Sequence, residues 1–305
     1  MLEVFTEHRR LLFDVAYRMT GSVADAEDLV QEAWLRWSTV DSDQVREPRA
    51  YLVRTITNLA LSQLTSARVR RERYVGPWLP EPLLTEPDAS QGAELAESVS
   101  TAMLVVLQTL TPLERAVFLL HDVFGYSHGE IASIVEKTET TVRQTASRAR
   151  AHVAARRPRF DTDATLRWQA AQRFRDACAG GDLAALLDLL APDVVAWADG
   201  GGKVSAARRP LVGADHVGRW LIGVVRKAAG LDVTITWLNG EPGLLAIAAG
   251  QPIGSVSLDL GGDGRICAVR LVVNPEKLRG LGSSPTPDPP PTPRTPRTPR
   301  TPRGS

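Results

Sequence analysis

Arginine, glutamine and hydroxyl side chains follow one another between residues 139 and 157, at spacings that suit the recognition of a nucleic acid. Five arginines lie in this stretch, and no acidic residue occurs between residues 142 and 157. Arginine and glutamine can bond base edges bidentately, whereas threonine and serine can bond phosphates. The candidate reading residues are Thr140, Thr141, Arg143, Gln144, Ser147 and Arg148.

Two short predicted helices must position these side chains. Ser127 and Glu130 form a capping box for the first helix, residues 131–135 carry its apolar stripe, and residues 136–139 form a turn. In the second helix an apolar face recurs at spacings of three and four, which turns the reading residues outward. That face comprises Val142, Ala146, Ala149 and Val153. The pattern predicts a helix-turn-helix, and a solvated basic helix on a helical domain is the alternative.

Length and composition are those of a soluble protein with two or three domains. The chain has 305 residues, of which 43% are hydrophobic, and a net charge of only +1. Nucleic-acid binding must therefore come from local arginine clusters, at residues 68–73 and 143–159. Cys178 and Cys267 are far apart, no charged leader precedes an apolar core, and no apolar run approaches the ~20 residues of a membrane span. We expect a cytoplasmic protein without a disulfide framework.

Three helices are predicted in the first 75 residues. The first covers residues 4–19 and ends at Gly21, and the second begins at a capping signal formed by Ser22 and Asp25. The third begins at Pro48 and turns basic toward its end. Polar residues line one side of the second helix, and by spacing alone such a stripe is usually just solvated. They are Asp25, Glu27, Asp28, Gln31 and Glu32.

A proline-rich segment, GPWLPEPLLTEPD at residues 76–88, must be a linker with extended stretches, because its four prolines exclude a continuous helix. It is unusually apolar, which suggests that it docks on another surface of the same protein. A helical pattern then runs from residue 94 to 110. Thr111, Pro112 and Glu114 start a further helix that ends at Gly125.

After residue 159 the pattern changes to that of an α+β domain. Helices are predicted at residues 166–179, 183–190 and 216–227, and strand-like runs at residues 233–238, 244–249, 253–260 and 266–273. Helices first and strands afterwards predict an antiparallel, curved sheet. Residues 285–303 end in repeated Thr-Pro-Arg triplets and are expected to be disordered.

Three ordered motifs in the first 160 residues resemble those of bacterial extracytoplasmic-function sigma factors. DAEDLVQEAWLRW from Asp25 resembles the region 2 helix that holds the polymerase clamp helices. PRAYLVRTITNLALSQL from Pro48 resembles the helix that reads the minus-ten element, and LTPLERAVFLLHDVFGYSHGEIA from Leu110 resembles region 4. The resemblance implies a subunit that binds core RNA polymerase, through the β′ clamp helices and the β flap, and directs it to promoter DNA.

The resemblance also implies roles for the polar residues. Polymerase contacts would be Asp25, Glu27, Asp28, Gln31 and Glu32. Unpaired minus-ten bases would meet the loop at residues 41–47 and Arg54, Asn58, Arg68, Arg70 and Arg71, where flipping a base costs a few kcal/mol. The minus-thirty-five duplex would be read by Thr140, Thr141, Arg143, Gln144, Ser147 and Arg148.

The remainder resembles a SnoaL-like domain of the nuclear-transport-factor-2 superfamily, a cone of curved sheet and helices. A subgroup of these sigma factors carries that domain with three motifs, present here as WLPEP, DGGGK and NPEKL. In that subgroup the extra domain is taken to regulate the sigma domains in cis, and no separate anti-sigma protein is expected. The implied regulatory residues are Trp78, Leu79, Pro80, Asp199, Gly200, Gly201, Gly202, Lys203, Asn274, Pro275 and Lys277.

These observations divide the chain into five segments. The expected domains are region 2 at residues 1–75, the linker at 76–93, region 4 at 94–159, the SnoaL-like domain at 160–282 and the tail at 283–305.

Two other function classes stay open at this point. One is a helix-turn-helix regulator that binds operator DNA without polymerase and senses a small-molecule effector in the cone. The other is a SnoaL-type cyclase or isomerase, for which Asp199, His216 and Asp232 are the candidate general bases. Nothing in their spacing requires catalysis, no set of metal ligands occurs, and we expect neither enzymatic activity nor a cofactor.

Overall fold

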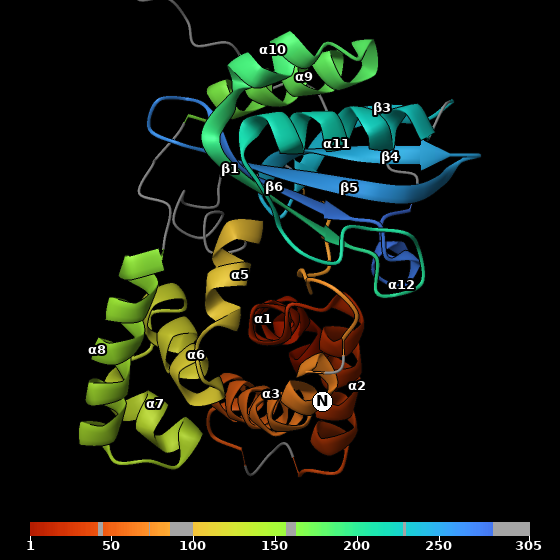
Figure 1. Cartoon of the computed structure of the whole chain (residues 1–305). Coiled ribbons are helices and arrows are strands. Elements are labelled where there is room, and N and C mark those ends of the chain that lie inside the picture. The colour runs from red at the N-terminus through yellow and green to blue at the C-terminus, as the bar shows by residue number, and fades with distance from the viewer. Residues whose placement is uncertain (42–44, 73, 86–99, 157–162, 228–229, 283–305) are drawn as a thin grey trace, which may run out of the picture.

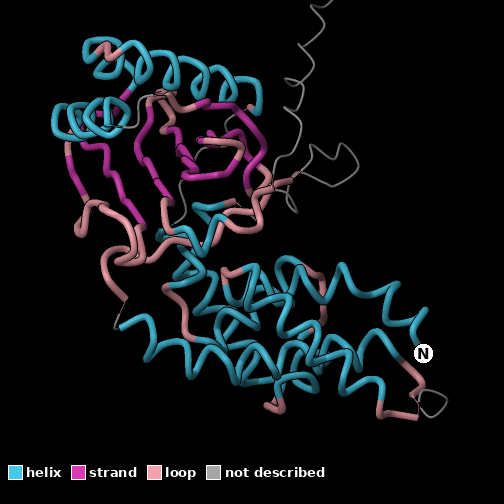
Figure 2. Tube along the Cα trace, turned by 90° about the vertical axis from the view of Figure 1, so that its right-hand side faces the viewer, coloured by secondary structure: helices cyan, strands magenta, loops and turns pink. Residues whose placement is uncertain are grey.

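The computed structural model describes residues 1–41, 45–72, 74–85, 100–156, 163–227 and 230–282, and of residues 66–72 only the backbone. Figure 1 shows a helical half that carries the N-terminus and a half in which helices cover a sheet. The quarter-turned view of Figure 2 keeps the two halves apart, with loops between them. Among the described helices, none has the length and apolar character needed to cross a membrane.

Helices α1 (Leu2–Thr20), α2 (Val23–Ser38) and α3 (Pro48–Glu72) form the first helical unit. Gly21 ends α1 with a φ of 71°, a left-handed conformation that glycine adopts without strain. The Ser22 hydroxyl accepts a hydrogen bond from the Asp25 backbone N–H and so caps α2, as the sequence predicts. Trp37 and Tyr17 are fully buried between these helices.

The second helical unit comprises α5 (Thr101–Gln108), α6 (Pro112–Phe118), α7 (His128–Val135) and α8 (Glu139–Arg156). A π-helical turn at Leu119–Val123 extends α6. Both predicted capping boxes are present, Thr111 with Glu114 and Ser127 with Glu130. The predicted helix from residue 94 is described only from Thr101, because residues 86–99 lie outside the described part of the chain.

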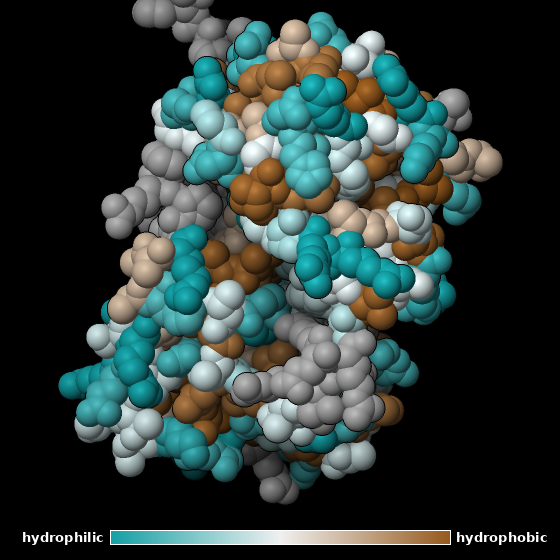
Figure 3. All heavy atoms as spheres, in the orientation of Figure 1, coloured by the Kyte–Doolittle hydropathy of each residue, from teal (hydrophilic) through white to brown (hydrophobic). Residues whose placement is uncertain are grey.

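The two helical units share one hydrophobic core. A single cluster of buried side chains runs from Phe5 in α1 to Val153 in α8. Contacts between α1 and α5, α1 and α6, α3 and α6, and α3 and α7 join the units. Figure 3 shows hydrophobic residues in the recess between the two halves of the molecule and mainly hydrophilic ones along the outer edge of α8.

The C-terminal domain begins with helices α9 (Ala164–Gly180) and α10 (Leu183–Leu189). Strands β1 (Leu190–Asp199) and β2 (Leu211–Val212) precede α11 (Ala214–Lys227). The remaining elements are β3 (Asp232–Leu238), β4 (Glu241–Ala248), β5 (Gln251–Leu260), β6 (Ile266–Val272) and α12 (Pro275–Leu278). The fold class predicted from the sequence, two helical sigma units followed by a helix-and-sheet domain, is confirmed.

The sheet has six strands in the order β2-β1-β6-β5-β4-β3. All neighbours are antiparallel except β1 and β6, which pair in parallel with Ala196 opposite Val269. The four predicted strand-like runs, β3 to β6, pair antiparallel as expected, and the parallel pair involves β1, which is not one of those runs. The chain reaches β6 from β1 through α11 and four further strands, and such a long crossover permits parallel pairing.

The two faces of the sheet have different neighbours. One face packs on α9, α10 and α11 around Trp168, Phe174 and Leu221. The opposite face carries a second cluster, in which Leu238, Leu245 and Val272 meet residues of the proline-rich segment and of α12. The sheet of the C-terminal domain thus lies between the helices of that domain and the linker (Figure 1).

Glu241 is a buried carboxyl at the start of β4, ion-paired with Arg167 of α9, and only 16% of its side chain is exposed. Burial raises its pKa from 4.5 to about 7, against the opposing effect of Arg167. Because the folded state binds this proton more tightly, the contribution of Glu241 to stability is present below about pH 4.5 and is lost as pH rises through about 7.

We therefore expect the free energy of unfolding of the wild type, relative to Glu241→Gln, to fall by about 1–3 kcal/mol between pH 5 and pH 8. Urea unfolding at both pH values measures this. Glu276→Gln is the control, because the Lys203 partner lowers the pKa of the exposed Glu276 and its titration lies below this window. A difference between wild type and Glu241→Gln that is the same at pH 5 and pH 8 would contradict the assignment.

Candidate nucleic-acid interface

Helices α7 and α8 form a helix-turn-helix. The α7 helix ends at Glu136, whose φ of 55° lies in the left-handed region that a glycine would favour. The hydroxyl of Thr138 accepts a hydrogen bond from the Thr141 backbone N–H at 3.2 Å and begins α8. The predicted inner face of α8 is buried, from Val142 at 1% exposed to Val153 at 5%.

The predicted duplex-reading residues lie together on the opposite side of α8. Thr141 is half-buried, and the other five are exposed. Arg143 is held by Glu139 at 2.5 Å, and Arg148 approaches the Thr145 hydroxyl at 3.5 Å. One helix face therefore presents the donors and acceptors that base edges in a major groove require.

Two of the predicted minus-ten readers of α3, Arg54 and Asn58, are turned toward this helix-turn-helix. The Arg54 guanidinium pairs with the Glu136 carboxylate, with Nη2 and Oε1 2.6 Å apart. The Asn58 amide donates a hydrogen bond to the Ile134 carbonyl at 3.2 Å. Both side chains are thus occupied by the end of α7. The side chains of Arg68, Arg70 and Arg71 and much of the loop at residues 41–47 lie outside the described residues.

The acidic side of α2 faces solvent. Glu27, Asp28 and Gln31 are exposed, and Asp25 and Glu32 are half-buried. Glu27 pairs with Arg9 and Glu32 with Arg36, both at the surface. This side of α2 is therefore accessible to solvent, although α7 contacts Arg54 and Asn58 of α3.

The linker binds the first helical unit through Glu81, which is 6% exposed. Its carboxylate accepts hydrogen bonds at the start of α2, from the Ser22 hydroxyl at 3.1 Å and the Val23 backbone N–H at 2.8 Å. Burial raises the pKa of Glu81, although these donors favour its charged form. The Glu81 backbone also donates to the Gly21 carbonyl and accepts from the Tyr17 hydroxyl.

The same linker binds the C-terminal domain. Asn239, in the β3–β4 turn, donates to the Tyr17 hydroxyl at 2.5 Å and accepts from the Leu83 backbone N–H at 3.2 Å. Thr85 donates its backbone N–H to the Trp237 carbonyl at 3.0 Å. Residues 81–85 therefore lie between α1 and the edge strand β3 and bond to both.

Asp199, at the end of β1 and fully buried, is the centre of what we call the Asp199 network. Its carboxylate accepts from the Tyr74 hydroxyl at 2.6 Å, the Leu79 backbone N–H at 2.8 Å and the Lys277 ammonium at 2.7 Å. A fourth donor is the Gly201 backbone N–H at 3.1 Å. Burial and this carboxylate raise the pKa of Tyr74, so the phenol stays protonated and donates.

Lys277 joins this network to the linker a second time. Its ammonium donates to the Leu79 carbonyl at 2.5 Å and lies 4.1 Å from the centre of the Trp78 ring. Asn274 caps α12 and donates its amide to the Tyr74 hydroxyl at 2.8 Å. The network thus joins the motifs WLPEP, DGGGK and NPEKL, which lie more than 70 residues apart along the chain.

The glycines of the DGGGK motif permit close backbone approach. Gly201 and Gly202 have φ values of 60° and 72°. A methyl group on Gly201 would overlap the Asn274 side chain, and one on Gly202 would lie 3.0 Å from Val75 Cβ. Lys203 is not part of the buried network, because it pairs with Glu276 at the surface.

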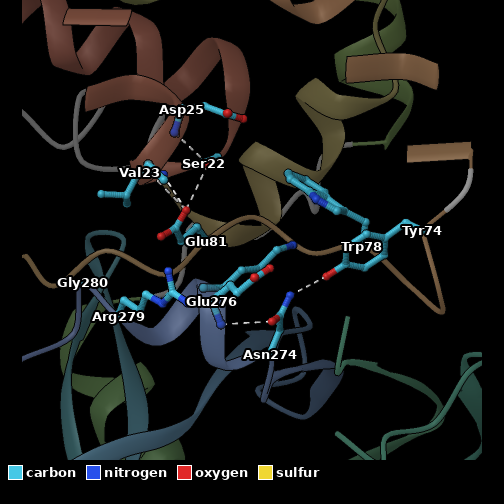
Figure 4. A pocket seen from close by; sticks show the side chains of 12 residues that line it. Ser22, Val23, Asp25, Tyr74, Trp78, Glu81, Asn274, Glu276, Arg279 and Gly280 are labelled. Atoms are coloured by element: carbon cyan, nitrogen blue, oxygen red, sulfur yellow. Dashed lines mark hydrogen bonds between the residues drawn. The ribbon is translucent and has the colours of Figure 1, made fainter. Parts of the chain in front are cut away.

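The linker, α2 and α12 border a cleft of about 690 Å³. Figure 4 shows its wall, with Glu81 pointing to the start of α2 and the Asn274 amide pointing to the Tyr74 hydroxyl. Asp25 and Arg279 also line the cleft. Solvent therefore reaches the junction of the three segments from one side.

The structure does not bring the three candidate general bases together. Asp199 is engaged in the interdomain network, whereas His216 on α11 and Asp232 at the start of β3 are exposed. No group of three or more potential metal ligands occurs among the residues that the structure describes.

Several contact residues were missed by sequence reasoning. Tyr17, Tyr74, Glu81 and Asn239 all make interdomain hydrogen bonds. Arg115 is 3% exposed and donates to the Met19 carbonyl at 2.5 Å across the two helical units. The one available signal was Glu81 within the WLPEP motif, because a charge in an otherwise apolar linker requires a partner when it is buried.

Comparison with known proteins agrees with this geometry. The family Sigma-70 region 2 matches residues 4–70, and the family Sigma-70, region 4 matches residues 100–153. These matches cover the helical units that hold the acidic side of α2 and the helix-turn-helix. The class of protein is therefore a sigma factor, which directs RNA polymerase to promoter DNA.

Similarities that extend over most of the chain show which kind of sigma factor this is. The chain is 39% identical to the ECF RNA polymerase sigma factor SigJ of Mycobacterium tuberculosis over 294 residues, 90% of this chain and 92% of that one. It is 31% identical to the probable ECF sigma factor SigI of the same organism, over 90% of this chain and 93% of that one. The chain belongs to the extracytoplasmic-function (ECF) sigma factors, as the sequence motifs predicted.

A crystal structure has the same architecture over nearly the whole chain. The extracytoplasmic function sigma factor SigJ of Mycobacterium tuberculosis superposes with a TM-score of 0.71 at 34% identity, covering 92% of this chain and 99% of that one. The arrangement of the helical units and the C-terminal domain is therefore shared with a solved relative.

We expect Lys277→Met to destabilise the protein by about 3–5 kcal/mol, because it leaves the buried Asp199 carboxylate without its cation. Lys203→Met is the matched control: its ion pair with Glu276 is half exposed and should contribute less than about 1 kcal/mol. Urea unfolding of the full chain compares the two. Equal effects would show that the Asp199 network does not stabilise the fold.

Proposed function

We propose that the arrangement described here is a closed state of the sigma factor, in which the C-terminal domain restrains promoter recognition in cis. The observation that carries the proposal is the contact between α3 and α7, where Arg54 and Asn58 bond to Glu136 and Ile134. In this state the residues proposed to trap minus-ten bases are occupied by the unit proposed to read the minus-thirty-five duplex.

The spacing of a promoter supports this view. The minus-ten and minus-thirty-five elements are separated by about 25 base pairs, which is roughly 80 Å of duplex at 3.4 Å per step. In this structure the helix-turn-helix is bonded to α3, with Glu136 Oε1 2.6 Å from Arg54 Nη2. In that position it cannot contact the distant minus-thirty-five element while α3 contacts the minus-ten element. Promoter binding at both elements therefore requires the α5–α8 unit to move away from α3.

The C-terminal domain restrains this movement because it contacts both helical units. It bonds directly to the first unit, where the Asn239 amide donates to the Tyr17 hydroxyl. Against the second unit, the Ser257 hydroxyl of β5 lies 3.1 Å from the Thr101 hydroxyl at the start of α5. A domain that is bonded to both units holds them in one relative position. A separate anti-sigma protein would otherwise have this role.

Core polymerase would bind first through α2. Its acidic residues remain exposed in the closed state, so the proposed polymerase contact is available before opening. The protein would then act where the polymerase acts, in the cytoplasm, and would contribute no chemistry of its own. The C-terminal domain would act as a regulator and not as a cyclase or isomerase.

We expect Asp28→Arg to weaken binding to core polymerase at least about tenfold, because reversing an exposed charge at a complementary interface creates repulsion. Glu7→Arg, which reverses an exposed acid on α1, is the control for net charge. Binding of the labelled full chain to core polymerase measures both. Wild-type affinity for Asp28→Arg would remove α2 from the polymerase interface.

We expect Glu136→Gln to raise run-off transcription by the holoenzyme by about 1.5- to 5-fold. The variant removes one exposed ion pair between α7 and α3, and such pairs contribute about 0.2–1 kcal/mol. Glu139→Gln is the control, because it removes the same charge from the same turn but pairs within α8.

Two results of this assay would contradict the closed-state proposal. One is an equal gain from Glu136→Gln and Glu139→Gln, which would assign the effect to DNA affinity. The other is identical promoter activity from the full chain and from a chain ending at residue 159, which would exclude regulation by the C-terminal domain.

A further inference from the structure

The loop between β1 and β2, residues 200–210, lies against the chain just after α3. A methyl group on Gly202 would lie 3.0 Å from Val75 Cβ, and one on Gly76 would lie 3.7 Å from Arg208 Cα. The two segments are therefore in van der Waals contact. The loop is further fixed at its start by the Asp199 network, where the Gly201 N–H binds the Asp199 carboxylate.

This loop presents two arginines to solvent beside a basic segment. Arg208 and Arg209 are exposed and make no hydrogen bond or ion pair with any other residue that the structure describes. By contrast, Lys203 of the same loop is paired with Glu276. The neighbouring end of α3 has four arginines and one glutamate in residues 68–73. The Arg208 and Arg209 guanidinium groups therefore place two exposed positive charges on the C-terminal domain, beside the chain that follows α3.

We propose that Arg208 and Arg209 bind backbone phosphates of promoter DNA, which makes the C-terminal domain a third DNA contact of the holoenzyme. This inference rests on the proposed function, because it takes α3 as the helix that meets the minus-ten region. Guanidinium groups bind phosphate bidentately, and such contacts supply affinity without reading sequence.

Charge favours DNA over the polymerase as the partner. The side of α2 proposed to meet the polymerase is acidic, so the polymerase surface opposite it is basic by complementarity. A pair of arginines would be repelled by such a surface. The DNA backbone, with one negative charge per ~1.7 Å of duplex, attracts them.

The contact is compatible with an open state. Opening separates α7 from α3, whereas Asp199, which directly precedes the loop, is hydrogen-bonded to Tyr74 and Leu79 in the segment that follows α3. The loop therefore moves with α3. When α3 binds the minus-ten region, Arg208 and Arg209 lie next to the neighbouring phosphates of the DNA backbone.

The salt dependence of promoter binding tests the proposal. Holoenzyme made from core polymerase and the full chain is titrated against a labelled promoter fragment between 50 and 200 mM salt. The double variant Arg208→Ala, Arg209→Ala should lower the slope of log K against log salt by about 1.8, because each phosphate contact contributes about 0.9. Over this range the wild type should then lose about tenfold more affinity than the double variant.

Two control variants accompany it. Arg226→Ala with Lys227→Ala removes two exposed cations from α11, on the same domain, and should keep the wild-type slope. Arg208→Lys with Arg209→Lys retains the charge and should restore most of the slope. All four altered side chains are exposed, so no loss of folding is expected from either alanine variant.

The outcomes are distinguishable. An unchanged slope for the double alanine variant overturns the proposed contact, and so does an equal loss for the α11 control. Weakened binding to core polymerase in the absence of DNA, with the slope unchanged, assigns the arginines to the polymerase and also overturns it. Equal gains in promoter binding for Glu136→Gln and Glu139→Gln in the same titration would instead overturn the proposed function, because only Glu136 pairs with α3.

Discussion

A buried ion pair between Asp199 and Lys277 determines how the domains of this sigma factor sit together. Taking two charges out of water costs several kcal/mol for each ion, and only good geometry with further hydrogen bonds offsets that cost. Here Asp199 has four donors, and Lys277 has the Leu79 carbonyl and the Trp78 ring in addition. Because several of these partners belong to the linker, the charges are satisfied only while the linker is docked.

The docked linker is also hydrogen-bonded to the first helical unit. Glu81 completes the start of α2 by accepting hydrogen bonds from two backbone N–H groups of its first turn, which have no partner within the helix. Tyr17 connects the Glu81 carbonyl and Asn239. The end of β1 is thus linked to the helix that carries the proposed polymerase contacts, through the bond of Asp199 to Leu79 and that of Glu81, two residues further along the linker, to Val23. The C-terminal domain is joined to region 2 at the level of individual donors and acceptors.

Sequence reasoning predicted what depends on local pattern. The capping boxes at Thr111 and Ser127 and the buried face of α8 follow from spacing, and all are present. The β1–β6 pairing depends on a crossover that no local pattern encodes, so the antiparallel sheet predicted from the four later strands lacks this parallel pair. Long-range polar contacts were missed for a related reason: a tyrosine such as Tyr74 or an asparagine such as Asn239 has no periodicity that reveals a distant partner.

The two interfaces of the closed state differ in how they could open. The contact between α3 and α7 includes exposed polar pairs such as Arg54 with Glu136, which water can replace at little cost. Beneath them, the helical units share a hydrophobic core, and Arg115 is buried at the boundary. Separating the units therefore exposes apolar surface, which is unfavourable in water at roughly 25 cal/mol per Å². If the units separate as proposed, a partner must cover that surface, and we therefore expect polymerase binding and opening to be coupled.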